Sequence, residues 1–278
     1  MAEVDAVDIC LPHPQHAAVA IAMARAGKHV LCEKPIALSV ADAEAMAAES
    51  RRAGVVFMPF HNMRLGGTAR RAIAYVRSGA LGQPLLVRGI MAHGGPDRGN
   101  SRRQWFHSRE AGGGAVLDLG PHLFDLLAAC GLVPIRVRAL LRRPADGEVE
   151  TDGIVEAETG DGVLAVLTLS WSLRGGRESE LTVQGSLGTM RWTMLREPPS
   201  LPGTAHLPLI AAIVGEPTPT VLEPEADDEP CAAFVRAIGG QPPALLPEDG
   251  VCSIRWIAAV YRSDAEGGAW VPFAPGSV

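Results

Sequence analysis

Residues 27–35 read GKHVLCEKP, and this short stretch decides the fold of the first part of the chain. The apolar, partly β-branched run at its centre predicts a buried strand, which starts after a glycine and closes at Glu33, Lys34 and Pro35. Open α/β sheets form their ligand crevice at the carboxyl ends of parallel strands, so Lys34 is a candidate active-site residue. A surface lysine before a proline turn is the alternative interpretation.

Strands and helices alternate on both sides of this stretch. Upstream, an apolar strand is expected before a Pro-His-Pro turn, and a helix follows it. Downstream, Ser39 is expected to cap an Ala-rich helix that ends at Gly54, before one more strand and one more helix. The expected elements are strands at Val4–Leu11 and Val55–Pro59, and helices at His16–Ala26 and Ala69–Ser78. This order predicts parallel strands with crossover helices.

The pattern changes after Gly82-Gln83-Pro84 to longer strands with alternating residues. Expected strands include Leu85–His93, Ile135–Arg143, Ile154–Thr159, Val163–Trp171, Glu180–Gly185 and Thr189–Met194. Helices are expected near 115–129, 230–238 and 251–262, and the Pro-rich stretch 197–229 is expected to be loop. The predicted fold class is α/β plus α+β. A partial Rossmann-type parallel sheet (residues 1–82) is followed by a mostly antiparallel open-sheet domain (residues 83–278) that binds substrate.

Composition is typical of a soluble globular enzyme. Hydrophobic residues make up 47% and charged residues 20% of the 278 positions, which excludes a disordered chain or a fibre. The net charge of -6 and the scattered arginines argue against nucleic acid as a partner. No apolar run reaches the ~18 residues of a membrane span, and the first residues do not resemble a signal peptide. We therefore expect a cytoplasmic protein with no membrane partner.

The five cysteines, Cys10, Cys32, Cys130, Cys231 and Cys252, are odd in number and far apart. Without the short paired spacing of zinc or redox dithiols they are predicted to be buried, reduced thiols. No metal site is predicted, because His13 and His16 flank a proline turn with no further ligand nearby in the sequence.

A second group of chemical side chains lies in GGGAVLDLGPHLFD, residues 112–125. On a helix, Asp118, His122 and Asp125 would share one face. A histidine flanked by two carboxylates would have a fixed tautomer and raised basicity, which suits a general base. A capping aspartate with a helix-surface histidine in an ion pair is an equal alternative. Because Gly120-Pro121 is a poor helix interior, the stretch could also be a turn that leads into the helix.

The loop from His93 to Glu110 combines cationic and aromatic side chains. It holds Arg98, Arg102, Arg103 and Arg109 around Trp105 and His107. Guanidinium groups bind anions and an indole stacks on a ring face. Trp105 and Arg109 are therefore candidate substrate-binding residues, together with Asp125 beside the histidine, and a solvated surface loop is the alternative.

Three motifs, taken together and in this order, resemble the Gfo/Idh/MocA family, which includes glucose-fructose oxidoreductase and inositol dehydrogenase. GKHVLCEKP resembles the family's glutamate-lysine-proline signature, and VDAVDICLPHPQH (residues 4–16) resembles the strand and loop before it. GGGAVLDLGPHLFD resembles the aspartate-to-histidine catalytic segment. The likeness continues more weakly through residues 181–192 and 247–263, so it covers essentially the whole chain.

The resemblance implies an NAD- or NADP-dependent oxidoreductase that acts on a sugar, inositol or related polyol by hydride transfer. Carried over by motif, Lys34 would orient the substrate and His122 would remove its hydroxyl proton. Asp118 would contact the substrate or orient the lysine. The residues that would line the cofactor cleft are Pro12, His13, His16, Glu33 and Arg64. Family members often associate through the second sheet, so a homo-oligomer is expected.

The sequence departs from the family pattern before Val4. Family members begin with a strand, a glycine-rich turn and a helix that binds the pyrophosphate, and roughly 60 to 70 residues of that nucleotide-binding half have no counterpart here. Gly94-Gly95 and Gly112–Gly114 do not open a βαβ unit with the right spacing. An incomplete reading frame and a natural loss of dinucleotide binding both explain this. An open sheet would leave Val4–Leu11 as an apolar edge that invites a partner chain.

Three functions follow from these observations. The first is the nicotinamide-dependent dehydrogenase or reductase. The second is a cofactor-independent lyase, epimerase or dehydratase that uses Lys34 and His122 for proton transfer alone. The third is a non-catalytic carbohydrate-binding subunit that pairs its open sheet with another protein.

Overall fold

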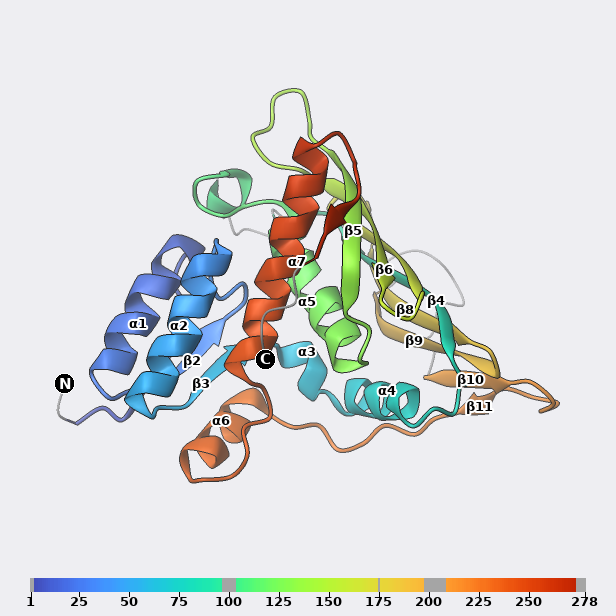
Figure 1. Ribbon diagram of the computed structural model, residues 1–278, viewed down its shortest axis with the longest axis horizontal. Helices are drawn as coiled ribbons and strands as arrows, with labels where there is room; N and C mark the ends of the chain where they lie inside the picture. The colour runs from blue at the N-terminus through green and yellow to red at the C-terminus, as the bar shows by residue number, and fades with distance from the viewer. Residues whose placement is uncertain (1–2, 97–103, 175, 198–208, 274–278) are drawn as a thin grey trace.

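Two β-sheets lie side by side, and one long helix runs between them (Figure 1). The structure is a computed structural model, and it describes residues 3–96, 104–174, 176–197 and 209–273. Arg98, Arg102 and Arg103, which the sequence placed in an anion-binding loop, lie outside the described residues.

The first sheet is parallel, with the order β1-β2-β3. Its strands are β1 (Ala6–Ile9), β2 (His29–Glu33) and β3 (Phe57–Phe60), and its helices are η1 (His13–Gln15), α1 (His16–Arg25) and α2 (Val40–Ala53). Ser39 caps α2 by accepting a hydrogen bond from the Asp42 amide, and Gly54 ends the helix with a φ of 66°. The predicted parallel unit and its cap are confirmed.

The two faces of this parallel sheet are covered by different parts of the chain. Side chains alternate along a strand, so Val30 and Cys32 face the main core on the α1 and α2 side. Leu31 and Met58 face the opposite way and pack against Phe234 of α6 (Pro230–Ile238). A helix encoded late in the sequence therefore completes the first sheet.

The second sheet has nine strands in the order β11-β10-β9-β8-β4-β7-β6-β5-β12. The strands are β4 (Pro84–His93), β5 (Pro134–Arg142), β6 (Asp152–Thr159), β7 (Leu164–Ser170), β8 (Arg177–Gly185), β9 (Gly188–Glu197), β10 (Ile210–Ile213), β11 (Thr220–Val221) and β12 (Val271–Pro272). Among the described strands of this sheet, β4 and β7 form the single parallel pair. The predicted, mostly antiparallel second sheet is confirmed.

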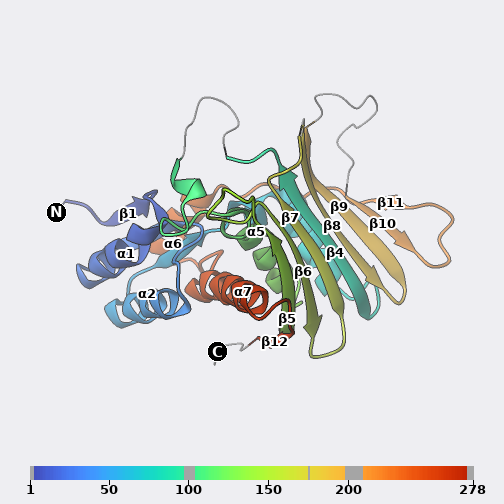
Figure 2. The ribbon, with the colours of Figure 1, turned by 90° about the horizontal axis from the view of Figure 1, so that it is seen from above.

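Helices cover one face of the second sheet and leave the other face open (Figure 2). The covering helices are α4 (Gly67–Arg77), α5 (Ala115–Ala129) and α7 (Pro247–Ala265). The short helix α3 (Asn62–Leu65) packs against α4 and α5, and η2 (Gln104–His107) lies near the first sheet. On the open face, Leu140, Ile154 and Val166 are 64%, 50% and 40% exposed. The alternation along these strands thus buries one set of apolar side chains and leaves a second set uncovered.

Helix α7 joins the two sheets, because it packs on α2 and β3 on one side and on α5 and β5 on the other. Trp256 in this helix is fully buried, and its ring stacks on Phe124 of α5 at a centroid distance of 4.8 Å. Since α6 and α7 both contact the first sheet, residues 83–278 do not pack only among themselves. The predicted division at residues 82 and 83 stays a prediction.

The helix expected near 115–129 is confirmed as α5, and the alternative of a turn at Gly120-Pro121 is wrong. Helix α5 runs unbroken through Pro121, because its burial on nearly every side outweighs the lost backbone hydrogen bond. Two further expectations about local structure are wrong. The stretch predicted as loop contains β10 and β11, which are too short to show a period. Cys10 and Cys231 are exposed rather than buried, since one follows an edge strand and the other opens a surface helix.

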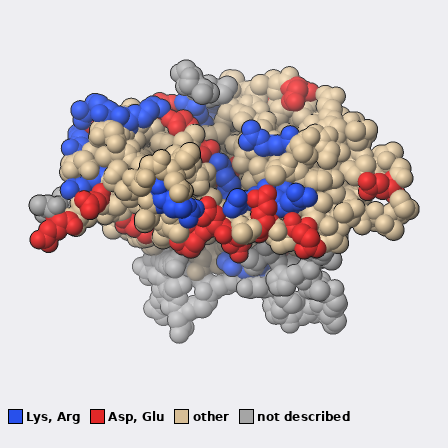
Figure 3. Space-filling view, turned by 90° about the horizontal axis from the view of Figure 1, so that it is seen from below, with Lys and Arg blue, Asp and Glu red and all other residues tan. Residues whose placement is uncertain are grey.

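Charges of both signs lie interspersed across the middle of the face seen in Figure 3. This agrees with the small net charge of the chain. In the described part of the protein, no helix is both long and apolar enough for a bilayer crossing.

Candidate active site

Lys34 and Asp118 meet where the two sheets adjoin. Lys34 directly follows β2, and Asp118 lies in the first turn of α5. The Lys34 ammonium donates to the Asp118 carboxylate (Nζ to Oδ1, 3.1 Å) and to the Asp118 backbone carbonyl (2.7 Å). Both side chains are mostly buried, with 17% and 15% exposed. The structure thus brings together two predicted catalytic residues that are far apart in the sequence.

The second oxygen of the Asp118 carboxylate is held from the large sheet. The Trp171 indole donates to Asp118 Oδ2 at 3.0 Å, and His93 Nε2 lies 3.4 Å from the same atom. Burial opposes ionisation of Asp118, but the charge of Lys34 and the contact with His93 outweigh it and hold the pKa of Asp118 well below its usual range. Asp118 is therefore an ionised anchor for the lysine.

Sequence reasoning missed His93 and Trp171 as site residues, although a signal for them existed. They stand at the ends of two predicted strands, and β4 and β7 are parallel neighbours in the sheet. Parallel strands bring their carboxyl ends to one edge. His93 and Trp171 therefore stand at the carboxyl ends of parallel strands in the second sheet, as Lys34 does in the first.

His122 lies one turn beyond Asp118 on α5. Among the described residues its buried Nδ1 atom has no hydrogen-bond partner. Burial, reinforced by the charge of Lys34, lowers the pKa of His122 well below its usual value. The expected rise in basicity from two flanking carboxylates is therefore wrong. The side chain is neutral at neutral pH and can accept a proton.

A cavity of about 500 Å³ opens beside Lys34 at the carboxyl end of the parallel strands. Its lining includes four of the five predicted cofactor residues, two of the three predicted catalytic residues and one of the three predicted substrate residues. These are Pro12, His13, His16, Glu33, Lys34, Asp118 and Trp105. The predicted base His122 is not part of this lining.

Two histidines in the lining of this cavity fix the loops that surround it. His13 donates from Nδ1 to the Gly112 carbonyl (2.9 Å) and lies edge-on to the Trp105 ring, with centroids 4.6 Å apart. The ring nitrogens of His16 face the carbonyl oxygens of Leu11 (2.7 Å) and Pro35 (3.0 Å). His16 therefore ties the loop after β1 to the loop after β2.

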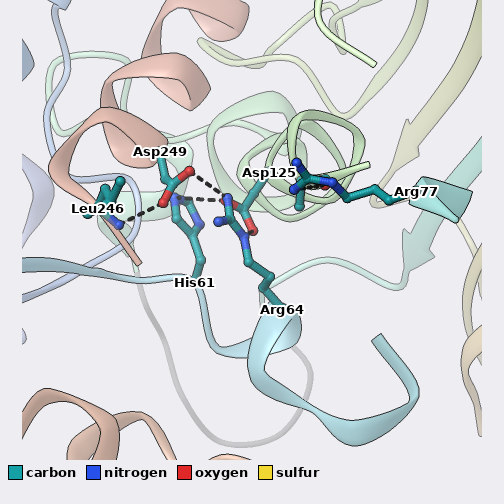
Figure 4. A network of polar contacts seen from close by, with 7 residues as sticks. His61, Arg64, Arg77, Asp125, Leu246 and Asp249 are labelled. Atoms are coloured by element: carbon teal, nitrogen blue, oxygen red, sulfur yellow. Dashed lines mark hydrogen bonds and ion pairs between the residues drawn. The ribbon is translucent and has the colours of Figure 1, made fainter. Parts of the chain in front are cut away.

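Arg64 and Asp125 bind each other instead of lining the cavity (Figure 4). Arg64 Nε donates to Asp125 Oδ2 at 2.9 Å, and Arg64 Nη2 donates to Asp125 Oδ1 and to Asp249 of α7. Asp125 is 2% exposed. The structure thus places the residue predicted for the cofactor and the residue predicted for the substrate in one ion pair, which connects α3, α5 and α7.

His61 is a buried neighbour of this ion pair that sequence reasoning did not select (Figure 4). Its Nε2 atom lies 3.8 Å from Asp125 Oδ1, and neither ring nitrogen has a hydrogen-bond partner in the described part of the structure. Burial lowers the pKa of His61, and the charge of Asp125 opposes this. Burial therefore favours the neutral imidazole in His61, as it does in His122.

Arg109 lies apart from the cavity beside Lys34. It lines a second cavity, together with Gly112 and Gly113. The substrate-binding pair predicted from the loop is therefore divided, because Trp105 lines the first cavity and Arg109 the second.

Comparisons with known proteins agree with this geometry. Residues 1–61 match the model of the oxidoreductase family with an NAD-binding Rossmann fold, and residues 69–191 match the GFO/IDH/MocA C-terminal domain. The chain is 31% identical over 283 residues to 1,5-anhydro-D-fructose reductase of Ensifer adhaerens, covering 96% of this chain and 79% of the reductase. It is 29% identical over 205 residues to myo-inositol 2-dehydrogenase of Thermotoga maritima, covering 70% and 58%.

Solved structures share the whole arrangement. Apo levoglucosan dehydrogenase superposes with a TM-score of 0.85 at 21% identity, over 100% of this chain and 82% of that chain. GenD2 from gentamicin A biosynthesis, solved in complex with NAD, superposes with a TM-score of 0.79 at 28% identity, over 99% and 80%.

The parallel sheet, the large mixed sheet and the lysine-aspartate pair between them define an oxidoreductase with an NAD-binding Rossmann part. The chain belongs to the Gfo/Idh/MocA family. The predicted family, fold class and enzyme class are confirmed.

Removing the cation of the buried ion pair is expected to destabilise the fold strongly. Arg64→Met leaves the Asp125 carboxylate, 2% exposed, without its partner. An unpaired buried charge costs about 3 to 5 kcal/mol, which urea denaturation measures. Arg51→Met is the matched control, because Arg51 pairs with Glu248, also in the first turn of α7, but at the surface. Such a pair contributes about 0 to 1 kcal/mol, and equal losses in both variants would contradict the argument.

The free energy of unfolding is expected to fall in acid, and part of this fall is expected to come from protonation of His13. Burial lowers the pKa of His13 to about 4 from an ordinary value of 6.5. The unfolded chain therefore takes up a proton at higher pH than the folded chain. The stability that the neutral form contributes is present above pH 6.5 and is lost as the pH falls toward 4, by about 3 kcal/mol.

The measurement is the free energy of unfolding in urea at pH 7 and at pH 4 for the native chain and His13→Gln. The glutamine amide retains a donor for the Gly112 carbonyl but does not titrate. The native chain should lose about 3 kcal/mol more than the variant between the two pH values. A parallel loss in both proteins would show that His13 is not responsible.

Proposed function

We propose that the chain carries the substrate site of a nicotinamide-dependent dehydrogenase or reductase that acts on a hydroxyl or carbonyl group of a sugar, inositol or related polyol. The observation that carries this proposal is the Lys34–Asp118 ion pair, with His122 one helical turn away, beside the cavity at the end of the parallel strands. The names of the relatives, a reductase of 1,5-anhydro-D-fructose and a myo-inositol dehydrogenase, support the substrate class.

The residues around the cavity suit the flat ring of a nicotinamide. Pro12, Trp105 and Phe106 supply apolar surfaces, and Lys34 supplies a positive charge at the inner end. Pro12, His13 and Glu33 are the residues we propose to hold NAD or NADP. When bound, the cofactor would supply the carbon atom that accepts or donates hydride.

Each polar residue then has a defined task. The Lys34 ammonium carries three protons, two of which bind Asp118, so the third can be donated to a substrate oxygen. Lys34 would thus stabilise the oxygen as the hydroxyl becomes a carbonyl. His122, neutral because burial lowers its pKa, would take the hydroxyl proton. Asp118 would stay ionised and keep the lysine directed toward the substrate.

The proposal predicts that Lys34→Ala and His122→Ala lose turnover by about 10²- to 10⁴-fold, the range for a general acid or base. The assay follows NADH or NADPH absorbance with a panel of sugars, inositols and their keto forms. Nicotinamide fluorescence, titrated in parallel, should show that both variants still bind the cofactor. Arg51→Met, at a surface ion pair, is the control and should keep full turnover.

The two other functions give different results in the same experiment. Turnover that needs His122 but no nicotinamide would replace the proposal with a redox-neutral lyase, epimerase or dehydratase. Sugar binding without turnover, together with an absence of nicotinamide binding, would replace it with a carbohydrate-binding subunit.

We also infer that the chain forms a homo-oligomer through the open face of the large sheet. Leu140, Ile154, Leu164 and Val166 on β5, β6 and β7 are each at least 40% exposed there. Apolar patches of this kind mark association sites.

A charge in this patch is expected to separate the subunits. Ile154→Glu should lower the mass measured by light scattering to that of one chain, because a carboxylate cannot be buried without a partner. Val235→Glu is the control, since Val235 is 64% exposed on α6, which belongs to the first sheet. A native chain that is already monomeric at micromolar concentration would contradict the inference.

A further inference from the structure

A second cavity, of about 550 Å³, has a lining that shares no residue with the cavity beside Lys34. Gly112 lies between the two. A Cβ atom added there would come within 2.4 Å of Leu38, which lines the second cavity, and 3.2 Å of His13, which lines the first. The second cavity has its own lining and is not used by the mechanism above.

Two arginines give this cavity hydrogen-bond donors that the protein does not fully use. Arg143 pairs with Asp264 at 2.8 Å, but its buried Nε has no acceptor among the described residues. The Arg109 guanidinium donates to the Glu148 backbone carbonyl at 3.0 Å, and it pairs with no carboxylate in the described part of the chain. Because both guanidinium groups line the cavity, it favours a ligand that supplies oxygen atoms to them.

Two acidic side chains, Glu150 and Asp264, also line the cavity. Glu150 accepts hydrogen bonds from the Val116 amide (2.9 Å) and the Tyr261 hydroxyl (3.0 Å), and burial raises its pKa. Asp264 pairs with Arg143. The Arg109 guanidinium has no carboxylate partner among the described residues, although the Glu148 carboxylate accepts a hydrogen bond from the Arg109 backbone amide at 3.3 Å. A single negative charge on a ligand can pair with Arg109, whereas a doubly charged anion would also meet Glu150 and Asp264.

The rest of the lining is apolar. Leu38, Leu117 and Val149 contribute aliphatic side chains beside the arginines. A ligand pocket of this kind combines an apolar wall with a few directed polar groups. The occupant should therefore have an apolar body in addition to its charge.

We propose that this cavity is a binding site for a small organic monocarboxylate. The guanidinium groups of Arg109 and Arg143 hold the carboxylate, whose planar pair of oxygens matches their donors. The apolar part of the ligand lies against Leu38, Leu117 and Val149. The site is distinct from the substrate site, and the proposal does not depend on the dehydrogenase function.

Calorimetric titration of the whole chain tests this with three probes. Benzoate has one negative charge and an apolar ring, benzamide has the same shape without the charge, and inorganic phosphate has the charge without the apolar body. Benzoate should bind with saturation. Benzamide and phosphate should bind at least tenfold more weakly, because each lacks one of the two features that the cavity provides.

Two arginine variants locate the binding. Arg109→Ala, at an exposed position, should weaken benzoate binding at least tenfold without loss of folding, which circular dichroism checks. Arg142→Ala should leave it unchanged, because Arg142 neighbours Arg143 in the sequence but pairs with Asp152 and lines no part of this cavity. The proposal is overturned if benzoate does not bind, if benzamide binds equally well, or if Arg109→Ala has no effect.

Discussion

The ion pair between Lys34 and Asp118 is the contact on which the site depends, because its two charges come from the two halves of the fold. Lys34 extends from the end of β2, whereas Asp118 belongs to a helix that packs on the large sheet. Both charges are largely removed from water, so neither is stable without the other. The indole of Trp171 fixes the remaining carboxylate oxygen. The position of the lysine in the cleft is therefore defined by the packing of the two sheets.

One face of α5 both positions the lysine and anchors the helix in the fold. Asp118 serves the site, and Asp125, two turns further along, serves the fold through Arg64 and Asp249. His122 lies between them on the same face, yet among the described residues its ring donates a hydrogen bond to neither carboxylate. Its surroundings therefore favour the neutral ring, which is the form a proton acceptor needs. The helix thus combines two charged anchors with one uncharged histidine, for which we propose the role of base.

The local pattern predicted much of this from the sequence. The strand before Lys34, the cap at Ser39 and the helix that carries Asp118 and His122 follow from periodicity and turn residues. The meeting of Lys34 with Asp118 was one of the two roles that the family resemblance implied for Asp118. The Arg64–Asp125–Asp249 network could not be predicted in this way, because its members come from three distant segments. No spacing rule relates them. Composition also did not reveal that the anion-binding arginine and the stacking tryptophan of one loop line different cavities.

The late position of α6 in the sequence has a consequence for biosynthesis. The sheet face that holds Leu31 and Met58 is covered by Phe234 and its neighbours, so it stays open on the ribosome until that helix has emerged. Chains fold domain by domain during synthesis, and exposed apolar faces invite aggregation. The first sheet of this protein cannot be finished in that order. Its nascent form is an unfinished sheet, and its completion waits until α6, about 170 residues after β3, has been synthesised.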